Sequence, residues 1–265
     1  MGAIMRMAVC IKQVPDIHEA LKVNRETGTM VREGIEGILN PFDEYAVEEA
    51  VRCKEKNGGE VVVITMGPPE AEEALIKCLS MKADRAVLLS DKKFAGSDTM
   101  ATSYTLASAI RKMGKFDLIF CGQRAIDGET GQVGPMLAEN LHVPQITYVS
   151  ELEIQGKEVI AKRQLEGGLL VVRCRMPLLL AVVKGINIPR VPTYSDLSDA
   201  MEKEITRWTA DDLGVDASRI GLRGSPTTVT RVWTPPLRKG GEILKGDSLE
   251  LSHHLAGVLL GILEG

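Results

Sequence analysis

The chain has 265 residues, of which 44% are hydrophobic, 4% aromatic and 26% charged, and its formal net charge is −4 at pH 7. This length and hydrophobic content suffice for a full buried core. The slight excess of acidic residues argues against nucleic acid as a main partner. No apolar run approaches the roughly 20 residues of a transmembrane helix, so we expect no direct insertion into a membrane.

The cysteines and histidines predict neither a metal site nor a catalytic group. Five scattered cysteines form neither a CxxC pair nor a zinc-site spacing: Cys10, Cys53, Cys78, Cys121 and Cys174. Such thiols are typical of a reducing compartment, so we expect a cytoplasmic protein. No histidine stands out as a ligand or a general base, and we predict no catalytic residue.

Apolar runs that alternate with helical patterns predict a parallel sheet. The runs are 7–11, 60–66, 86–90 and 115–121, and the helical segments that follow them are 44–56, 71–81, 100–113 and 136–141. Four such alternations predict an α/β fold with a doubly wound, mostly parallel, Rossmann-like sheet. The segment 21–38 between the first strand and the first helix predicts an irregular hairpin.

Polar residues follow several of these strands, and the carboxyl ends of parallel strands are where doubly wound sheets bind ligands. Lys12 could meet a phosphate or a flavin carbonyl, or could simply be exposed. Asn40 and Asp43 precede or open the first helix, and N-terminal capping alone would explain them equally well. Gly67 opens the next helix and is a candidate for contact with a phosphate or adenine group. Thr99, like Asp98, is a candidate N-cap of the third helix, and Thr99 could also reach a ligand.

The longest strand-end loop, 122–135, is rich in glycine. Its glycines allow sharp turns and close approach to a ligand, and the following helix N-terminus could help to hold a phosphate. Thr130 and Gln132 could add hydrogen bonds, while Asp127 and Glu129 could accept them from ribose hydroxyls. The alternative is a surface loop stabilised by its own Asx turns. Neither the GxGxxG fingerprint nor a P-loop is present.

The pattern changes after Pro144. Three alternating segments predict an antiparallel meander at the sheet edge, and 177–183 predicts one more buried strand; the three are 145–154, 156–163 and 168–175. Residues 205–250 predict an extended arm with little core, followed by a helix at 249–263. Such an arm is ordered by packing on another surface, which predicts a partner subunit. We therefore expect an α/β domain at 1–186 and a docking loop with a C-terminal arm at 187–265.

Four motifs, in this order and spacing, resemble the beta (small) subunit of electron transfer flavoproteins: Cys10-Ile-Lys-Gln-Val-Pro-Asp16, Asn40-Pro-Phe-Asp43, Thr65-Met-Gly-Pro-Pro69 and Ala125-Ile-Asp-Gly-Glu-Thr130. The resemblance covers almost the whole chain. It implies a heterodimer with an FAD-carrying alpha subunit and no independent enzyme activity.

The resemblance also implies which residues contact the cofactor. Those outside the glycine-rich loop are Cys10, Asn40, Pro41, Phe42, Asp43 and Met66. Those in the loop are Gly122, Gln123, Arg124, Ala125, Ile126, Asp127, Gly128, Glu129, Thr130, Gly131, Gln132 and Val133.

Two branches of the family differ in the ligand of this site. The ordinary beta subunit holds AMP as a structural element and shuttles electrons from dehydrogenases to a quinone reductase. In the electron-bifurcating branch the same cleft holds FAD, which NADH reduces. One electron then passes to ferredoxin or flavodoxin, and the other passes through the alpha-subunit FAD to a partner flavoprotein. Residues 63–69, 94–99, 128–135 and 224–229, with Trp233, are similar to the bifurcating branch.

Some positions depart from the family pattern. Gln123 and Arg124 stand where a basic residue followed by Gln is usual, and Gly131 stands where many bifurcating relatives have Ala. Residues 189–195 match the family's docking loop for acyl-CoA dehydrogenases, but residues 200–205 replace the lysine-rich run that often follows it. The implied partner is therefore a flavoprotein dehydrogenase of the acyl-CoA or lactate type, or a quinone reductase. A homodimeric nucleotide-binding regulator of the universal-stress type is a further alternative.

Overall fold

The computed structural model describes residues 4–16, 22–23, 30–31, 37–230, 241 and 243–263. The chain forms two compact units, Met1–Arg231 and Val232–Gly265. The first unit contains the sheet and every element discussed below except one. The second contains the helix α7 (Ser248–Leu263), which agrees with the helix predicted at 249–263.

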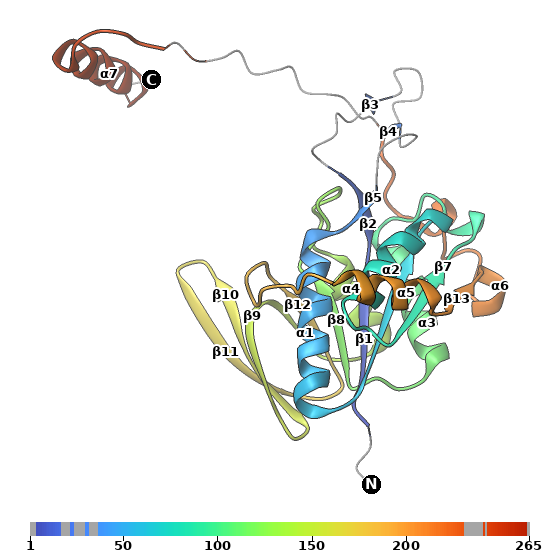
Figure 1. Ribbon diagram of the computed structural model, residues 1–265. Helices are drawn as coiled ribbons and strands as arrows, with labels where there is room; N and C mark the ends of the chain where they lie inside the picture. Colours follow the sequence, from blue (N-terminus) through green and yellow to red (C-terminus); the bar gives the residue numbers. More distant parts are fainter. Residues whose placement is uncertain are drawn as a thin grey trace. The chain divides into compact units, whose positions relative to one another are not determined.

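The larger unit is built on a nine-stranded sheet in the order β11-β10-β9-β12-β8-β1-β6-β7-β13 (Figure 1). Six strands run parallel to one another: β1 (Arg6–Ile11), β6 (Glu60–Met66), β7 (Arg85–Leu89), β8 (Leu118–Gly122), β12 (Leu178–Val182) and β13 (Ile205–Trp208). The other three form the antiparallel meander at one edge, and its first strand joins the sheet by pairing parallel with β12: β9 (Gln145–Gln155), β10 (Glu158–Leu165) and β11 (Gly168–Arg175). The predicted fold class is confirmed.

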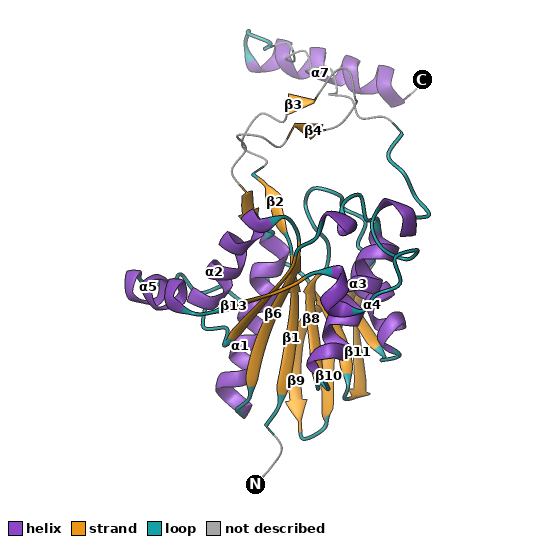
Figure 2. Ribbon diagram, turned by 90° about the vertical axis from the view of Figure 1, so that its right-hand side faces the viewer, coloured by secondary structure: helices purple, strands orange, loops and turns teal. Residues whose placement is uncertain are grey.

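Helices cover both faces of the sheet. The helices α1 (Pro41–Asn57) and α2 (Glu72–Ser80) lie on one face, and α3 (Thr99–Met113) and α4 (Val133–Leu141) lie on the other (Figure 2). Successive strand residues point to opposite faces, so Val63 packs in the cluster with α1 and α2 while Val62 packs with α3 and α4. Central strands that are buried on both faces read as continuous apolar runs, which is why the sequence revealed them.

Short elements connect these layers. The strand β2 (Gln13–Pro15) leaves the main sheet and pairs with β5 (Gly37–Leu39), as the proline in this segment predicts. Between them β3 (Lys22–Val23) pairs with β4 (Met30–Val31), and the rest of the hairpin predicted at 21–38 lies outside the described residues. Three 3-10 turns are found at Pro69–Ala71, Lys92–Phe94 and Leu222–Gly224.

The chain after β12 contains more core than the sequence predicts. The strand β13 is the ninth strand of the sheet, and Ile205, Ala210 and Ile220 are buried. The expectation that the arm carries little core is therefore wrong for residues 205–220, because a four-residue strand is too short to show a period. Trp233 lies outside the described residues. The predicted division at residue 186, with packing of 187–265 on a partner subunit, stays a prediction.

Two helices in this region were not predicted from the sequence. They are α5 (Tyr194–Glu202), which packs on α2, and α6 (Ala210–Leu213). Each follows a threonine that forms a capping box with an aspartate three residues later. The spacing Thr-x-x-Asp was the signal that could have located both helices.

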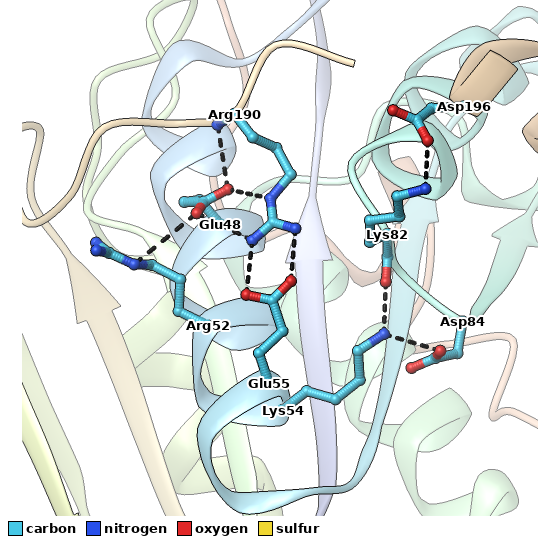
Figure 3. Close-up of polar contacts among 8 residues, drawn as sticks. All are labelled: Glu48, Arg52, Lys54, Glu55, Lys82, Asp84, Arg190 and Asp196. Carbon is cyan, nitrogen blue, oxygen red and sulfur yellow. Dashed lines mark hydrogen bonds and ion pairs between the residues drawn. The ribbon is translucent and has the colours of Figure 1, made fainter. Parts of the chain in front are cut away.

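The segment that leads into α5 is fixed to α1 by acidic side chains (Figure 3). The Arg190 guanidinium donates to Glu48 Oε2 at 2.8 Å and to Glu55 Oε1 at 2.7 Å, and Arg190 N also donates to Glu48. Three residues earlier, Asn187 Nδ2 donates to the buried Glu49 at 2.8 Å. At the start of α5, Lys82 pairs with Asp196.

Candidate functional site

The candidate site lies at the carboxyl ends of β1 and β8. The chain continues from β1 to β6 and β7 on one side, whereas β8 and β12 lie on the other, so the strand order reverses between β1 and β8. Such a switch point is where open α/β sheets bind ligands. The N-terminus of α1 meets it, because Asn40 N donates to Lys12 O at 2.9 Å.

Asp43, in the first turn of α1, joins these two strands. Its Oδ2 accepts from Lys12 N at 2.8 Å and its Oδ1 accepts from Gly122 N at 3.0 Å. The side chain is buried, and burial raises the pKa of Asp43 to about 7, although the hydrogen bonds from Asn40, Lys12 and Gly122 act in the opposite direction. The carboxyl group therefore ties two strand ends to one helix N-terminus.

Asn40 joins the same helix to the glycine-rich loop. It occupies the N-cap position of α1, but its side chain makes no capping hydrogen bond. Instead, Nδ2 donates to Arg124 O at 2.9 Å, and Oδ1 accepts from Ile126 N at 3.2 Å. Capping thus explains the position of Asn40 and not its side chain, whereas Pro41 stands at the first helical position as predicted.

Gly122 is needed for this close approach. A Cβ atom at this position would lie 2.4 Å from Asp43 Oδ1 and 2.7 Å from the carbonyl carbon of Phe42. Gly128 differs, since a Cβ atom there would have no neighbour within 4 Å. The backbone around Gly128 is therefore open, and Gly131 adopts a positive φ of 60° that favours glycine.

Asp127 is the loop residue whose polar groups are least satisfied. Its Oδ2 accepts from Lys12 Nζ at 2.5 Å. Its Oδ1 is buried and has no hydrogen-bond partner within the described part of the chain. Because a buried oxygen without a donor costs free energy, this atom fits an incoming hydroxyl group. Glu129 is exposed by contrast, with Arg124 Nε at 3.8 Å from its carboxylate.

Gln123 and Arg124, which both depart from the family pattern, differ in their surroundings. Gln123 is buried, and its Oε1 accepts from the backbone N of Tyr148 at 2.8 Å, so it supports the meander. Arg124 is exposed and lies over the Phe42 ring at 5.2 Å. Ala125 O accepts from Glu129 N at 2.9 Å, which closes a turn in the loop.

The second half of the loop leads into α4 and contacts the start of α3. Thr99 Oγ1 and Gln132 Oε1 lie 3.1 Å apart in a hydrogen bond, and Asp98 caps α3 through the N–H groups of Met100 and Ala101. Thr130 is exposed, and Val133 begins α4, which starts earlier than the predicted Met136.

Cys10 lies near the end of β1, and Met66 and Gly67 lie at the end of β6. Burial raises the pKa of the Cys10 thiol to about 12, so it is neutral. Gly67 N donates to Leu89 O, and a Cβ on Gly67 would lie 2.9 Å from that of Ala71, so this glycine serves the turn into α2. Met66 ends β6, next to β1 in the sheet.

The described residues contain neither a metal-binding cluster nor a membrane-spanning helix. No group of three or more His, Cys, Asp or Glu side chains in the described ranges could hold a metal ion. Among the helices whose residues are described, none is long and apolar enough to cross a membrane. The fold and the site thus define a doubly wound α/β protein with a glycine-rich loop at its switch point.

Comparison with known proteins identifies the family. The sequence matches the electron transfer flavoprotein domain over residues 27–213. It is 46% identical over 261 residues to the Caffeyl-CoA reductase-Etf complex subunit CarD of Acetobacterium woodii, with 98% of each chain covered. It is 47% identical over 252 residues to the electron transfer flavoprotein subunit beta of Thermoanaerobacterium thermosaccharolyticum, covering 95% of this chain and 96% of that one. The chain belongs to the electron transfer flavoprotein family, as a beta subunit.

A third relative, Protein FixA of Bradyrhizobium diazoefficiens, is 47% identical over 242 residues, covering 88% of this chain and 84% of that one. The resemblance found in the sequence motifs is thereby confirmed, and the universal-stress alternative is wrong. A beta subunit of this family implies a flavin or nucleotide ligand, an alpha-subunit partner and electron transfer to other proteins.

Proposed function

We propose that this chain is the beta subunit of an electron-bifurcating flavoprotein and that its switch-point site binds FAD. NADH is the electron donor, and the acceptors are ferredoxin or flavodoxin and, through the alpha-subunit FAD, a partner flavoprotein dehydrogenase. The observation that carries the nucleotide site is Asp127, whose buried Oδ1 has no partner within the described residues. A ribose hydroxyl group would supply the missing donor.

The residues around Asp127 fit the rest of a nucleotide. Lys12 balances the carboxylate charge, and the backbone at Gly128 is open to a ligand. The N–H groups at the start of α4, which has nine residues, are suited to phosphate. The flavin supplies the redox chemistry when it is bound, while the protein binds it, orients it and limits its exposure to water.

The choice of FAD rests on sequence similarity. The segments 63–69 and 128–135, which flank this site, are similar to the bifurcating branch. The name of CarD assigns that relative to a complex with a caffeyl-CoA reductase, which supports a CoA-dependent flavoprotein as the type of partner. The alternative function is a non-bifurcating subunit that holds AMP through the same ribose and phosphate contacts.

The two functions differ in their ligand count. We would purify the chain with its alpha subunit, denature the heterodimer and quantify the released FAD and AMP. Two FAD molecules and no AMP per heterodimer are expected, together with bleaching of flavin absorbance when NADH is added without oxygen. One FAD and one AMP would contradict bifurcation and leave the ordinary subunit.

Asp127 itself can be tested in the same heterodimer. The variant Asp127→Ala is expected to weaken nucleotide binding by about tenfold, as loss of one hydrogen bond to a charged group predicts. Glu166→Ala, an exposed acid in the turn between β10 and β11, is the control and should change affinity by less than about twofold. Equal losses in both variants would contradict the role of the buried oxygen.

A further inference from the structure

We propose that Asn40 and Asp43 are positioning residues, which hold the loop 122–132 in its binding conformation without touching the nucleotide through their side chains. The sequence resemblance places both among cofactor contacts. The hydrogen bonds of the structure assign them a different task. This inference rests on the proposed function, because the loop is taken to hold the nucleotide.

Both polar atoms of the Asn40 side chain form hydrogen bonds within the protein. A carboxamide has two donor hydrogens and one acceptor oxygen. Nδ2 donates to Arg124 O at 2.9 Å and Oδ1 accepts from Ile126 N at 3.2 Å, and the proximity of the amide to Asp43 acts to lower the pKa of that carboxyl group. The residue is only 1% exposed. Both polar atoms of this buried side chain therefore bond to the loop backbone.

The carboxylate of Asp43 is used in the same way. Each oxygen accepts one backbone N–H group, from Lys12 at the end of β1 and from Gly122 at the end of β8. One side chain therefore bridges the two strands between which the strand order reverses. The missing Cβ of Gly122 leaves room for this bridge. We call these bonds of Asn40 and Asp43 the loop brace.

The start of the loop is also held by Gln123, whose N donates to Val182 O at 2.9 Å and whose Oε1 accepts from Tyr148 N at 2.8 Å. The attachments of the later loop residues outside the loop brace lie at the surface. The side chain of Lys12, which pairs with Asp127, is 48% exposed, and the Thr99–Gln132 hydrogen bond is also at the surface. Exposed pairs contribute little to stability, whereas buried hydrogen bonds in a network define one conformation. The loop brace therefore preorganises the loop, which lowers the conformational cost of ligand binding.

The test compares Asn40→Ala with Asn187→Ala. Asn187 is a matched control because it is also buried and also donates to α1, at Tyr45 O and Glu49 Oε2, without a hydrogen bond to the loop. Both variants would be made in the full chain bound to its alpha subunit, with nucleotide removed. Amide hydrogen exchange of residues 122–132 would then be measured without ligand, followed by titration with FAD and with AMP.

We expect Asn40→Ala to accelerate exchange of the loop amides, Ile126 in particular, by about tenfold or more in the ligand-free protein. Asn187→Ala should leave this exchange unchanged. Affinity for FAD and for AMP should fall by a similar factor in Asn40→Ala, since a disordered loop weakens every ligand that it holds. If Asn40→Ala fails to fold, Asn40→Ser, which keeps a preferred N-cap residue for α1 and removes the amide that donates to Arg124 O, should show the same acceleration.

Unchanged loop exchange in Asn40→Ala with weaker FAD binding would overturn the proposal, because it would make Asn40 a direct ligand. Equal acceleration in both variants would also overturn it, since the effect would then be general destabilisation. If the wild-type heterodimer binds neither FAD nor AMP at this site, the proposed function fails, and the ligand-free exchange still decides whether the loop brace exists.

Discussion

Gly122 is a glycine because α1 begins against it. Asp43 and Phe42 approach so closely that any side chain at this position would overlap them. Asn40 and Asp43, in turn, are polar and buried because strand ends and loops carry backbone groups that need partners. At the residue scale, Asn40 and Asp43 use their side chains to satisfy backbone N–H and carbonyl groups at the site.

Replacing Gly122 tests this packing. We expect Gly122→Ala to lower the free energy of unfolding by about 2 kcal/mol, because the added Cβ forces α1 and the end of β8 apart. Gly128→Ala, in the open part of the same loop, should change it by less than about 0.5 kcal/mol. Urea denaturation of both variants measures the difference, and equal effects would contradict the crowding at Gly122.

The pKa of Asp43 predicts a dependence of stability on pH. This pKa is raised from 3.8 to about 7 by burial, so the folded protein holds a proton that the unfolded chain releases at lower pH. The contribution of Asp43 to stability is therefore full below about pH 4 and is lost as the pH rises toward 7.

The variant Asp43→Asn isolates this contribution from those of the other acids. The stability of the wild type relative to Asp43→Asn should be greater at pH 5 than at pH 8, because only the wild type loses a proton in between. Denaturant unfolding of both proteins at the two pH values measures it. A difference that stays constant with pH would show that Asp43 titrates normally.

At the scale of elements, the segment between β12 and α5 is attached to α1 by hydrogen bonds and ion pairs. Glu48 and Glu49 are neighbours on α1, and both are buried, which requires partners. Arg190 and Asn187 supply them, and burial raises the pKa of Glu49 despite its hydrogen bond to Asn187. The apolar side chains of Ile188, Val191 and Tyr194, on the attached segment and at the start of α5, are exposed.

Removing Arg190 should therefore cost more than removing an exposed arginine. Arg190→Ala leaves the buried Glu48 with the backbone N–H of residue 190 at 3.1 Å and with Arg52, at 3.9 Å, as its remaining cation, so we expect a loss of about 2 kcal/mol in unfolding free energy. Arg85→Ala breaks an exposed pair with Glu60 at 3.5 Å and should cost less than about 1 kcal/mol. Chemical denaturation distinguishes them, and equal small losses would show that Glu48 is satisfied without Arg190.

At the scale of the whole molecule, the sheet is completed by a strand far along the chain. β13 covers the edge of β7 through parallel pairing from Ile205↔Ala86 to Trp208↔Leu89. Without it, the backbone groups of β7 would form an open edge, which favours aggregation. The compact unit accordingly extends to Arg231.

Truncation tests where this unit ends. A chain that stops at Arg231 should keep a cooperative thermal transition within a few degrees of the full chain, whereas a chain that stops at Lys203 should aggregate or lose cooperativity. Light scattering and calorimetry report both outcomes. A stable, monomeric chain ending at Lys203 would show that β13 is dispensable for the core.

The sequence by itself determined the α/β class, the meander and the family of this protein. Central strands and helices have strong local periods, and the strand-end motifs are specific in their order and spacing. Asn40, Asp43 and Asp127 could be selected as site residues from their positions after predicted strands. Their roles could not be separated there, because capping, bracing and ligand binding use the same side-chain types.

Only the tertiary structure decided which polar atoms have partners. It placed the donors of Asn40 on the loop, the oxygens of Asp43 on two strand ends, and left Asp127 Oδ1 without a donor in the described part of the chain. It also brought β13 beside β7, more than 100 residues earlier in the chain. Both results depend on contacts between distant segments, which no local pattern encodes.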